Sequence, residues 1–303
     1  MRVLSLFGGC EGLGVGLRQA GLSHVDSYDY NPQAVATAKA NGFPATQRDL
    51  TRGQVSFMAP DLLTAGVPCP RFSRATSRTR ANHMDLWPTA LEHVGHQDPR
   101  WFLGETVKGM LSPSHGATAS DVWRGLRELG YEHVSYVVLD AADFGCPTHR
   151  RRLFFVAGPK PIVWPAPTHG GQGQPRLRTL GDIMGPDDGL KMYGPECGRA
   201  GSEPWRISLP GAAVMTTEVK GTRASNASGW TFNGGPDRLS DSMFLATGRR
   251  RATWRECAKA VGFPDDFVFT GNVESRYRQI GNSISPVMGK ALGQAIMEAD
   301  TRG

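Results

Sequence analysis

Cysteine is scarce in this chain, and its arrangement excludes two kinds of stabilising site. The 303 residues hold five cysteines, an odd number, and no two of them have the C-x-x-C spacing of a metal or redox motif. We therefore expect neither a disulfide framework nor a bound metal. A reducing compartment fits this usage, and one of the five thiols is a candidate nucleophile.

Long apolar runs are also missing. No stretch reaches the roughly 18 apolar residues that span a bilayer. The apolar start at residues 1–7 gives way at once to glycines, which makes it too short for a signal peptide. There is no internal repeat and no low-complexity tail. We expect a cytoplasmic protein with no membrane partner.

The overall composition is that of an ordinary globular protein. Hydrophobic residues make up 39% and charged residues 20% of a chain long enough for one large core with a smaller lobe, or for two modest domains. The formal charge of +6 suits a polyanionic partner, but such a charge is also common in proteins that never meet nucleic acid. Charge alone therefore leaves the partner open.

Short apolar runs alternate with amphipathic stretches in the first half, which is typical of a parallel sheet covered by helices. From residue 159 to about 248 the chain is rich in Gly, Pro, Ser and Thr, which predicts an irregular second lobe. A last apolar helix should pack back on the first domain. The expected strands are 3–7, 24–29, 61–67, 101–104, 134–139 and 153–157. A first helix is expected to end near residue 20, and further helices are expected over 32–41, 121–129, 253–261 and 286–297.

The first expected strand runs into a glycine-rich turn, Leu6 to Gly14, before a helix begins. Such turns let the backbone approach a nucleotide, and the following helix N-terminus attracts anionic groups. Asp29 ends the next strand, about 20 residues on, where an acidic residue is placed to grip a ribose. A packing turn and a helix-capping turn are the plain alternatives for these two features.

Cys69 stands between two prolines directly after an apolar run, and Arg71, Arg74, Arg78 and Arg80 follow it. Nearby positive charge favours the thiolate, which is the nucleophilic form of the side chain. The same arginines are placed to grip phosphates. Taken alone, a buried inert cysteine is the commoner explanation.

Two further strings carry charge beside expected strands. Glu105 follows the run 101–104, where a partly desolvated carboxyl group has a raised pKa and can donate a proton. Arg150 and Arg152 alternate in an extended segment, so both side chains can face one site. A surface turn and a solvated basic run are the respective alternatives.

Together, and in this order, the motifs resemble those of the cytosine-C5 DNA methyltransferases over nearly the whole chain. The most specific strings are Pro68-Cys69 and the segment from Gln279 to Pro286. Residues 6–9 are similar to the family's cofactor loop, 66–73 to its nucleophile motif, 105–107 to its Glu-Asn-Val and 148–152 to its Gln-x-Arg-x-Arg. Residues 254–256 are similar to its Arg-Glu segment, 262–267 to its Gly-Phe-Pro segment and 279–286 to its last motif.

The chain also departs from the family's pattern. Glu11 stands where one of two paired glycines is usual, and we expect its carboxylate near the methionine end of the cofactor. The nucleophile, the acid and both arginines are retained, so we expect activity. The other departures are Ser5 for Asp, Asp29 for Glu, Pro70 for Gln, Thr106 for Asn and Thr148 for Gln.

The resemblance implies an α/β fold with a Rossmann-like class I methyltransferase sheet and helices on both faces. Residues 1–160 and 271–303 would form the catalytic, cofactor-binding domain, and residues 161–270 a small, irregular target-recognition domain. We expect a monomer whose partner is double-stranded DNA. Contacts to phosphates, rather than to guanine bases, or a solvated position are the commoner roles of arginines in such a domain. The candidates are Arg199, Arg206, Arg223, Arg249, Arg250 and Arg251.

The implied reaction moves a methyl group from S-adenosylmethionine to C5 of a flipped-out cytosine. Cys69 would add to C6, Glu105 would interact with N3 and the exocyclic amine, and Arg152, with Arg150, would hold O2. Phe7 would stack on the adenine, and the loop would contribute Gly9, Gly12 and Leu13. The remaining implied cofactor residues are Asp29 and Tyr30 at the ribose, Asp49 and Leu50 at the adenine edge, and Asn282 and Ser283 at the methionine end.

Three alternatives stay open beside this expectation. The same chemistry is compatible with a transfer RNA cytosine, because the small domain is short. The departures are compatible with a catalytically silent DNA-binding homologue, or with transfer of a group other than methyl. The recognition sequence and the biological role, whether defence, self-protection or regulation, are not encoded in any motif that we can interpret.

Overall fold

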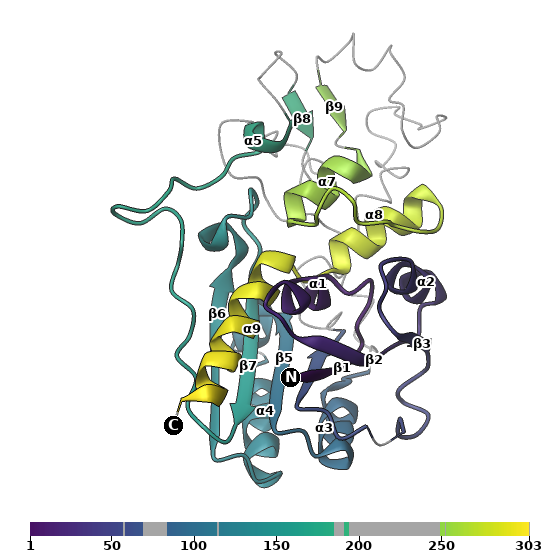
Figure 1. Ribbon diagram of the computed structural model, residues 1–303, viewed down its shortest axis with the longest axis vertical. Helices are drawn as coiled ribbons and strands as arrows, with labels where there is room; N and C mark the ends of the chain where they lie inside the picture. The colour runs from purple at the N-terminus through teal and green to yellow at the C-terminus, as the bar shows by residue number, and fades with distance from the viewer. Residues whose placement is uncertain are drawn as a thin grey trace.

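A seven-stranded sheet forms the centre of the molecule (Figure 1). The computed structural model describes residues 1–56, 58–68, 84–113, 115–184, 191–193, 249–251 and 253–302. The strand order is β3-β2-β1-β4-β5-β7-β6. The strand β7 pairs antiparallel with β5 and with β6, and the other pairs are parallel. The strands are β1 (Arg2–Leu6), β2 (Ser23–Asp29), β3 (Ala45–Gln47), β4 (Leu62–Gly66), β5 (Trp101–Val107), β6 (His133–Asp140) and β7 (Arg151–Gly158).

The pairing of neighbouring strands brings their carboxyl ends to one level. Leu6 lies opposite both Tyr28 and Ala65, and Gly66 lies opposite Glu105. Ligands of open α/β sheets bind at this edge. The residues that form one row across the edge are therefore Asp29, Phe7, Gly66 and Glu105.

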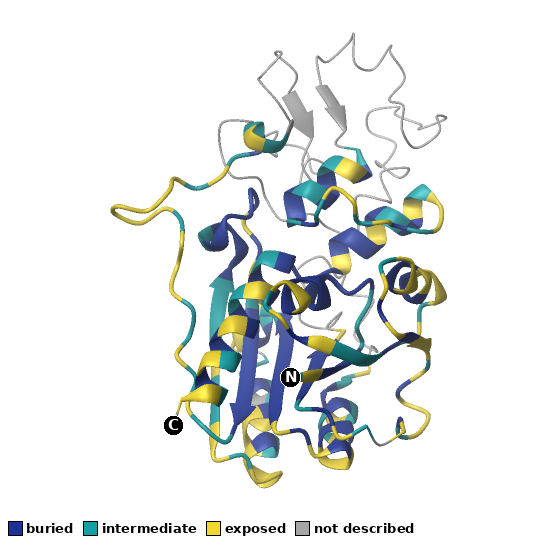
Figure 2. Ribbon diagram, viewed as in Figure 1, coloured by how far each residue is buried: buried dark blue, intermediate teal, exposed yellow. Residues whose placement is uncertain are grey.

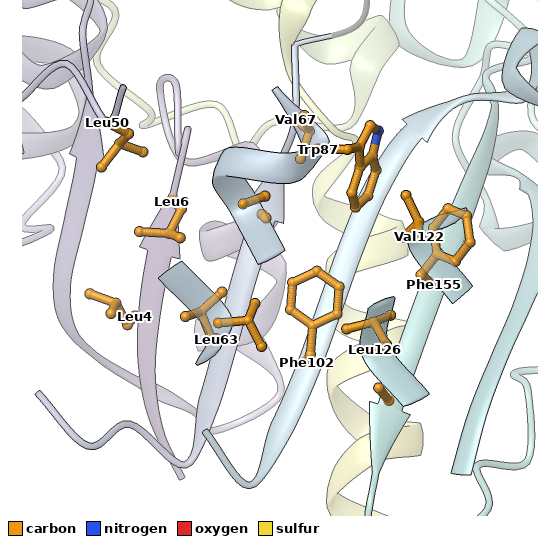
Figure 3. Packing of buried hydrophobic residues seen from close by; sticks show 14 of the residues in the cluster. Leu4, Leu6, Leu50, Leu63, Val67, Trp87, Phe102, Val122, Leu126 and Phe155 are labelled. Atoms are coloured by element: carbon orange, nitrogen blue, oxygen red, sulfur yellow. The ribbon is translucent and has the colours of Figure 1, made fainter. Parts of the chain in front are cut away.

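One face of the sheet is covered by α3 (Trp87–Gln97) and α4 (Gly116–Glu128). Their apolar side chains join those of β1, β4, β5 and β7 in a continuous core (Figure 3). Trp87 and Phe155 meet edge to face at its centre, with ring centroids 5.4 Å apart. Burying these large apolar surfaces stabilises the sheet and fixes the position of its carboxyl edge.

The opposite face is covered by α1 (Gly12–Gln19) and α9 (Pro286–Thr301). The two helices pack closely because glycines face each other: a Cβ on Gly16 would lie 2.1 Å from the carbonyl oxygen of Pro286, and one on Gly289 would lie 2.5 Å from that of Leu13. Figure 2 shows the buried side of α9 against the sheet and its exposed side towards solvent. The C-terminal helix thus returns to the first domain, as predicted. At the sheet edge, α2 (Pro32–Ala40) follows β2.

A smaller lobe lies beyond the carboxyl edge of the sheet (Figure 1). Its apolar cluster includes Trp254, Phe263, Phe269 and Ile280. At the start of α7, Thr253 and Glu256 form a reciprocal capping box that fixes where the helix begins. The elements of the lobe are α5 (Gly181–Met184), β8 (Lys191–Tyr193) paired in parallel with β9 (Arg249–Arg251), and α7 (Trp254–Val261). The helix α8 (Val273–Asn282) follows them and joins the same apolar cluster.

The structure confirms the predicted fold class and changes several element boundaries. The helices α3 and α8 and the strand β3 were not predicted. The strand β5 continues to Val107, so Glu105 lies within it rather than after it, and β7 begins at Arg151. Backbone pairing between β5 and β7 explains why both strands extend this far, since Val107 pairs with Arg152. None of the helices in the described part of the chain has the length and apolar character needed to cross a membrane.

Candidate active site

The loop between β1 and α1 has an unusual backbone. The angle φ is 53° at Phe7, 58° at Gly9 and 65° at Glu11, a left-handed conformation that residues other than glycine rarely adopt. The Gly9 N–H donates to Oδ2 of Asp29 over 2.9 Å. A Cβ on Gly9 would meet no atom within 4 Å, so the loop has open space on that side. This cradle fits a nucleoside-type cofactor held beside an acidic residue.

Glu11 belongs to the same loop, and the expected place of its carboxylate near the methionine end of the cofactor stays a prediction. Its side chain is 1% exposed and turns beneath the loop. Its Oε1 accepts a hydrogen bond from Ser27, and its Oε2 accepts one from Ser5 over 3.5 Å. The glycine-to-glutamate departure therefore fills the space under the cofactor loop.

The last motif packs directly on this loop. A Cβ on Gly12 would lie 1.9 Å from Oγ of Ser283 and 2.3 Å from the carbonyl oxygen of Ile284, so only glycine fits there. Ser283 is buried and donates to Ile284, whereas Asn282 is exposed. The structure thus brings Ser283 to the cofactor loop, although it lies about 270 residues further along the sequence, and a contact of Asn282 with a cofactor stays a prediction.

The other expected cofactor residues differ in what they offer to a ligand. Tyr30 is exposed, and Asp29 has a pKa raised by burial, which hydrogen bonds from Asn31 and Gly9 partly oppose. Asp49 is exposed and accepts from Thr51. Leu50 and Leu13 are buried and present no exposed side chain. Their contacts with a cofactor stay predictions.

Glu105 and Arg152 form an ion pair at the carboxyl edge. The Arg152 Nε lies 3.0 Å from the Glu105 Oε1, and the two side chains are 17% and 11% exposed. Burial raises the pKa of Glu105, although the charges of Arg152 and Arg150 oppose this shift. A carboxyl group that holds its proton more readily than usual is suited to proton donation.

Arg150 has a different set of partners from Arg152. Its side chain is buried and donates to the carbonyl oxygens of Gly281 and Ser283. Burial lowers the pKa of Arg150 to about 9, with the neighbouring charge of Arg152 adding to the shift and Glu105 opposing it. Arg150 lies one residue before β7, and its side chain is bound to the last motif. Whether it also contacts a base stays a prediction.

The segment before β7 also holds the end of α7. Cys146 and Thr148 both donate to the carbonyl oxygen of Ala260, over 3.0 and 2.7 Å, and Ser285 donates to that of Val261 over 2.5 Å. These carbonyl groups lie in the last turn of α7, where no N–H group of the same helix is available to donate to them. Thr148, which replaces the family's Gln, is thus a structural link between the sheet and the smaller lobe.

One charged cluster was missed by the sequence reasoning. Asp140 accepts from Nδ1 of His149 and Nε of Arg151, each over 3.0 Å, and from the backbone N–H of Arg150 over 2.8 Å. Burial alone would raise the pKa of Asp140, but these hydrogen bonds lower it. The sequence signal for this cluster was the pair His149 and Arg151, because alternate residues of an extended segment face away from Arg150 and Arg152.

Cys69 lies outside the described residues, as do Arg71, Arg74, Arg78 and Arg80. The strand β4 ends at Gly66, opposite Glu105, and Cys69 follows three positions later in the sequence. Among the cysteines that the structure describes, Cys10, Cys146 and Cys257 are buried. Burial raises the pKa of Cys10 to about 12 and also raises that of Cys146, so neither is suited to act as a thiolate nucleophile.

A hollow of about 260 Å³ lies against the amino end of β6, lined by Trp123, His133, Lys160 and Trp164 among others, and this end is opposite to the carboxyl edge. The described residues contain no group of three His, Cys, Asp or Glu side chains that would hold a metal ion. Among the expected target-reading arginines, Arg249, Arg250 and Arg251 form β9, and Arg199, Arg206 and Arg223 lie outside the described residues.

The sequence matches the family described as C-5 cytosine-specific DNA methylase over residues 1–188 and 199–298. The chain belongs to this family. The predicted family is thereby confirmed, together with the prediction of a cytosine-5 methyltransferase that acts on DNA and uses a methyl donor. The match includes the edge residues and the smaller lobe, so both lobes belong to one methylase.

Relatives of this methylase support the same assignment. The Type II methyltransferase M.NgoMIV of Neisseria gonorrhoeae is 30% identical over 308 residues, covering 98% of this chain and 97% of that protein. The fold matches the Entamoeba histolytica methyltransferase EhMeth with a TM-score of 0.69 at 14% identity, over 100% of this chain and 99% of that one. It also matches S. pombe Dnmt2 with a TM-score of 0.65 at 18% identity, over the whole of both chains.

Proposed function

We propose that this methylase transfers a methyl group from S-adenosylmethionine to C5 of a cytosine flipped out of double-stranded DNA, through a transient bond between Cys69 and C6. The observation that carries the proposal is the buried ion pair of Glu105 and Arg152. Glu105 lies on β5, next to the strand β4 that leads to Cys69, and at the same level of the sheet as the cofactor loop.

The loop residues are suited to S-adenosylmethionine. Gly9 leaves open space, Phe7 lies two residues before it in the same loop, and Asp29 ends the neighbouring strand. Asn282 and the N-terminal turn of α1 would hold the amino-acid end, because a helix N-terminus favours a carboxylate. When bound, the cofactor supplies an electrophilic methyl group on a sulfonium.

The residues at the edge perform the remaining chemistry. The Cys69 thiolate forms a bond to C6 of the ring, and the electron pair of the C5–C6 double bond then attacks the methyl group from C5. Glu105 donates a hydrogen bond or proton at N3, which removes negative charge from the ring as the thiolate adds. Loss of the C5 proton to solvent then returns an electron pair to the ring and expels the thiolate.

Arg152 would have two roles in this sequence. Its guanidinium pairs with Glu105, so it holds the carboxyl group in place. Its remaining N–H donors would bind O2 of the cytosine, where negative charge grows. Since a stacked base exposes neither N3 nor C6, the cytosine must leave the helix, at a cost of a few kcal/mol.

The smaller lobe would read the DNA sequence. It lies beyond the edge that carries Glu105, so a duplex bound between the lobes would present its base to the ion pair (Figure 1). We assign residues 1–160 and 271–303 to the catalytic domain and 161–270 to target recognition. A monomer suffices for this arrangement, and a bound metal is not needed for the chemistry. A cytoplasmic location also stays a prediction.

The test is a trapping experiment on DNA in which cytosine is replaced by 5-fluorocytosine. Fluorine cannot leave C5 as a proton does, so the Cys69 bond should persist after methyl transfer. Genomic fragments amplified with the fluorinated nucleotide provide a substrate even though the recognition sequence is unknown. We expect a protein–DNA complex that survives denaturation, requires S-adenosylmethionine, and is absent in Cys69→Ala.

Matched variants and substrates separate the alternatives. Cys146→Ala removes a buried thiol and should leave trapping intact. Persistence of the complex in Cys69→Ala would disprove the covalent step at this residue. Methyl transfer to transfer RNA but not to DNA would replace the proposed substrate, and DNA binding without transfer to either would favour a silent homologue.

A further inference from the structure

A buried carboxyl group lies directly beneath the cofactor loop. The Glu11 side chain occupies a space that two glycines leave open: a Cβ on Gly8 would lie 2.1 Å from its Oε1, and one on Gly14 would lie 2.0 Å from its Oε2. The carboxyl group in this position therefore uses room that a side chain at residue 8 or 14 would take. It thus packs against the backbone of the same loop whose Gly9 faces open space.

The surroundings of this carboxyl group are polar but hold no firm counter-charge. Ser27 and Ser5 donate hydrogen bonds to it, and Thr64 in turn donates to Ser5 over 3.0 Å. The Nε2 of His24 lies 3.5 Å from Oε2, with its side chain fully buried against Phe43. Hydroxyl groups stabilise a carboxylate less than a cation does, so ionisation here is costly.

The protonation state of the pair follows from burial. Burial raises the pKa of Glu11 to about 7, an effect that the hydrogen bonds from Ser27 and Ser5 oppose. Burial also lowers the pKa of His24 to about 4, helped by the positive charge of Arg18. Near neutral pH, Glu11 is therefore partly ionised beside an uncharged imidazole. The other charged or titratable groups that act on this pair are Asp29, Arg18 and Cys10.

A ligand on the open side of the loop would interact with Glu11 according to the ligand's charge. The methyl donor carries a sulfonium cation, whereas the product that remains after transfer is a neutral thioether. An ionised carboxylate attracts the first and not the second, and the low-dielectric surroundings strengthen this interaction. We propose that Glu11 is a positioning residue whose ionised carboxylate makes the cofactor loop prefer the cationic donor over its neutral product.

This inference rests on the proposed use of S-adenosylmethionine, and it predicts a specific pH dependence. Below the pKa of Glu11 the carboxyl group is neutral and the preference is absent; above it the preference is complete. The ratio of the product's Kd to the donor's Kd should rise roughly three- to tenfold between about pH 6 and about pH 8. Titration of the ligands' own amino group, which both share, largely cancels in the ratio.

The experiment is calorimetric binding of S-adenosylmethionine and S-adenosylhomocysteine to the full chain without DNA. Glu11→Gln keeps the size and the hydrogen-bond acceptor but cannot ionise, so its Kd ratio should stay flat with pH. Glu92→Gln, an exposed glutamate on α3, is the matched control and should behave as the wild type. A ratio that rises equally in Glu11→Gln, or that stays flat in the wild type, would overturn the inference.

A second measurement needs only the wild-type protein, in case the variant does not fold. Binding near pH 7 in buffers of different ionisation enthalpy gives the number of protons released. Donor binding should release a larger fraction of a proton than product binding, because only the donor favours ionised Glu11. Equal release with both ligands overturns the inference alone, whereas failure of the wild type to bind either ligand overturns the proposed cofactor as well.

Discussion

At the scale of single residues, Glu105 is the acid that the proposed reaction requires. Glu105→Gln keeps the shape of the side chain and loses the proton, so we expect the rate of methyl transfer to fall about a hundredfold or more. In the wild type the rate should decline as pH rises through the raised pKa of Glu105, because the protonated form is lost. Single-turnover rates across pH test this, and a variant with an unchanged rate would remove Glu105 from the mechanism.

Arg150 and Arg152 should separate into a structural and a catalytic residue. Arg150→Lys loses the geometry that serves two buried carbonyl oxygens, so we expect the free energy of unfolding to fall by about 2–4 kcal/mol. Arg152→Lys should lower the transfer rate with a much smaller effect on stability, because its partner Glu105 lies at the edge of the site. Urea unfolding and transfer rates, measured on both variants, should give opposite rankings.

The sequence predicted these residues better than it predicted their partners. The alternation of Arg150 and Arg152 was sufficient to infer that both face inward. It could not show that Gly281 and Ser283, more than 120 positions away, accept from one of them. The inward turn of Glu11 was equally hidden, because it depends on room left by Gly8 and Gly14 and on Ser27 from the next strand.

At the scale of elements, the crossing of α1 and α9 depends on glycine. Gly16→Ala would place a methyl group 2.1 Å from the carbonyl oxygen of Pro286, which the two backbones cannot relieve without moving apart. We expect a loss of about 1–3 kcal/mol of unfolding free energy. Gly116→Ala, at the start of α4, has nothing within 4 Å and should be neutral or stabilising. Equal thermal shifts in the two variants would contradict this account.

Asp140 joins the end of β6 to the start of β7. Its pKa is lowered by its hydrogen bonds, so its stabilising contribution is present above the ordinary pKa of aspartate and is lost as pH falls through the lower, folded value. Asp140→Asn should cost about 1–3 kcal/mol near pH 7, and the difference from wild type should shrink below about pH 4.

Asp143→Asn is the matched control for that experiment. The pKa of Asp143 is raised, first by burial and then by the charge of Asp140, so loss of its charge should not destabilise the protein. Urea unfolding of both variants across pH is the measurement. A loss at Asp140 that does not change with pH would show that its charge is not involved.

Helices and strands were predicted correctly where their side chains are mostly apolar. They were missed where contacts with other segments determine the structure. The strands β6 and β7 contain runs of β-branched or aromatic residues and were recognised from them. The helix α8 is mostly polar, since only one of its sides is buried, and it was missed. The end of β5 was placed too early because Glu105 is polar, yet its backbone pairs with β7 and its charge pairs with Arg152.

At the scale of the whole molecule, composition predicted a sheet domain and an irregular lobe, and the order of the motifs predicted that the chain returns to the first domain. What composition could not predict is how closely the two ends meet. The loop at Gly12 and the helix behind it rest on Ser283 and on Gly289. The cofactor cradle is therefore built jointly by the first and last segments of the sequence.

This joint construction has a consequence for synthesis on the ribosome. While the polypeptide is still growing, α1 has no partner for its glycine-lined side, and the floor of the cradle is incomplete. Contacts between such distant segments form late and slowly. A nascent chain should therefore gain the ability to hold a methyl donor only after α9 has left the exit tunnel, so that a chain still lacking this helix cannot yet modify DNA.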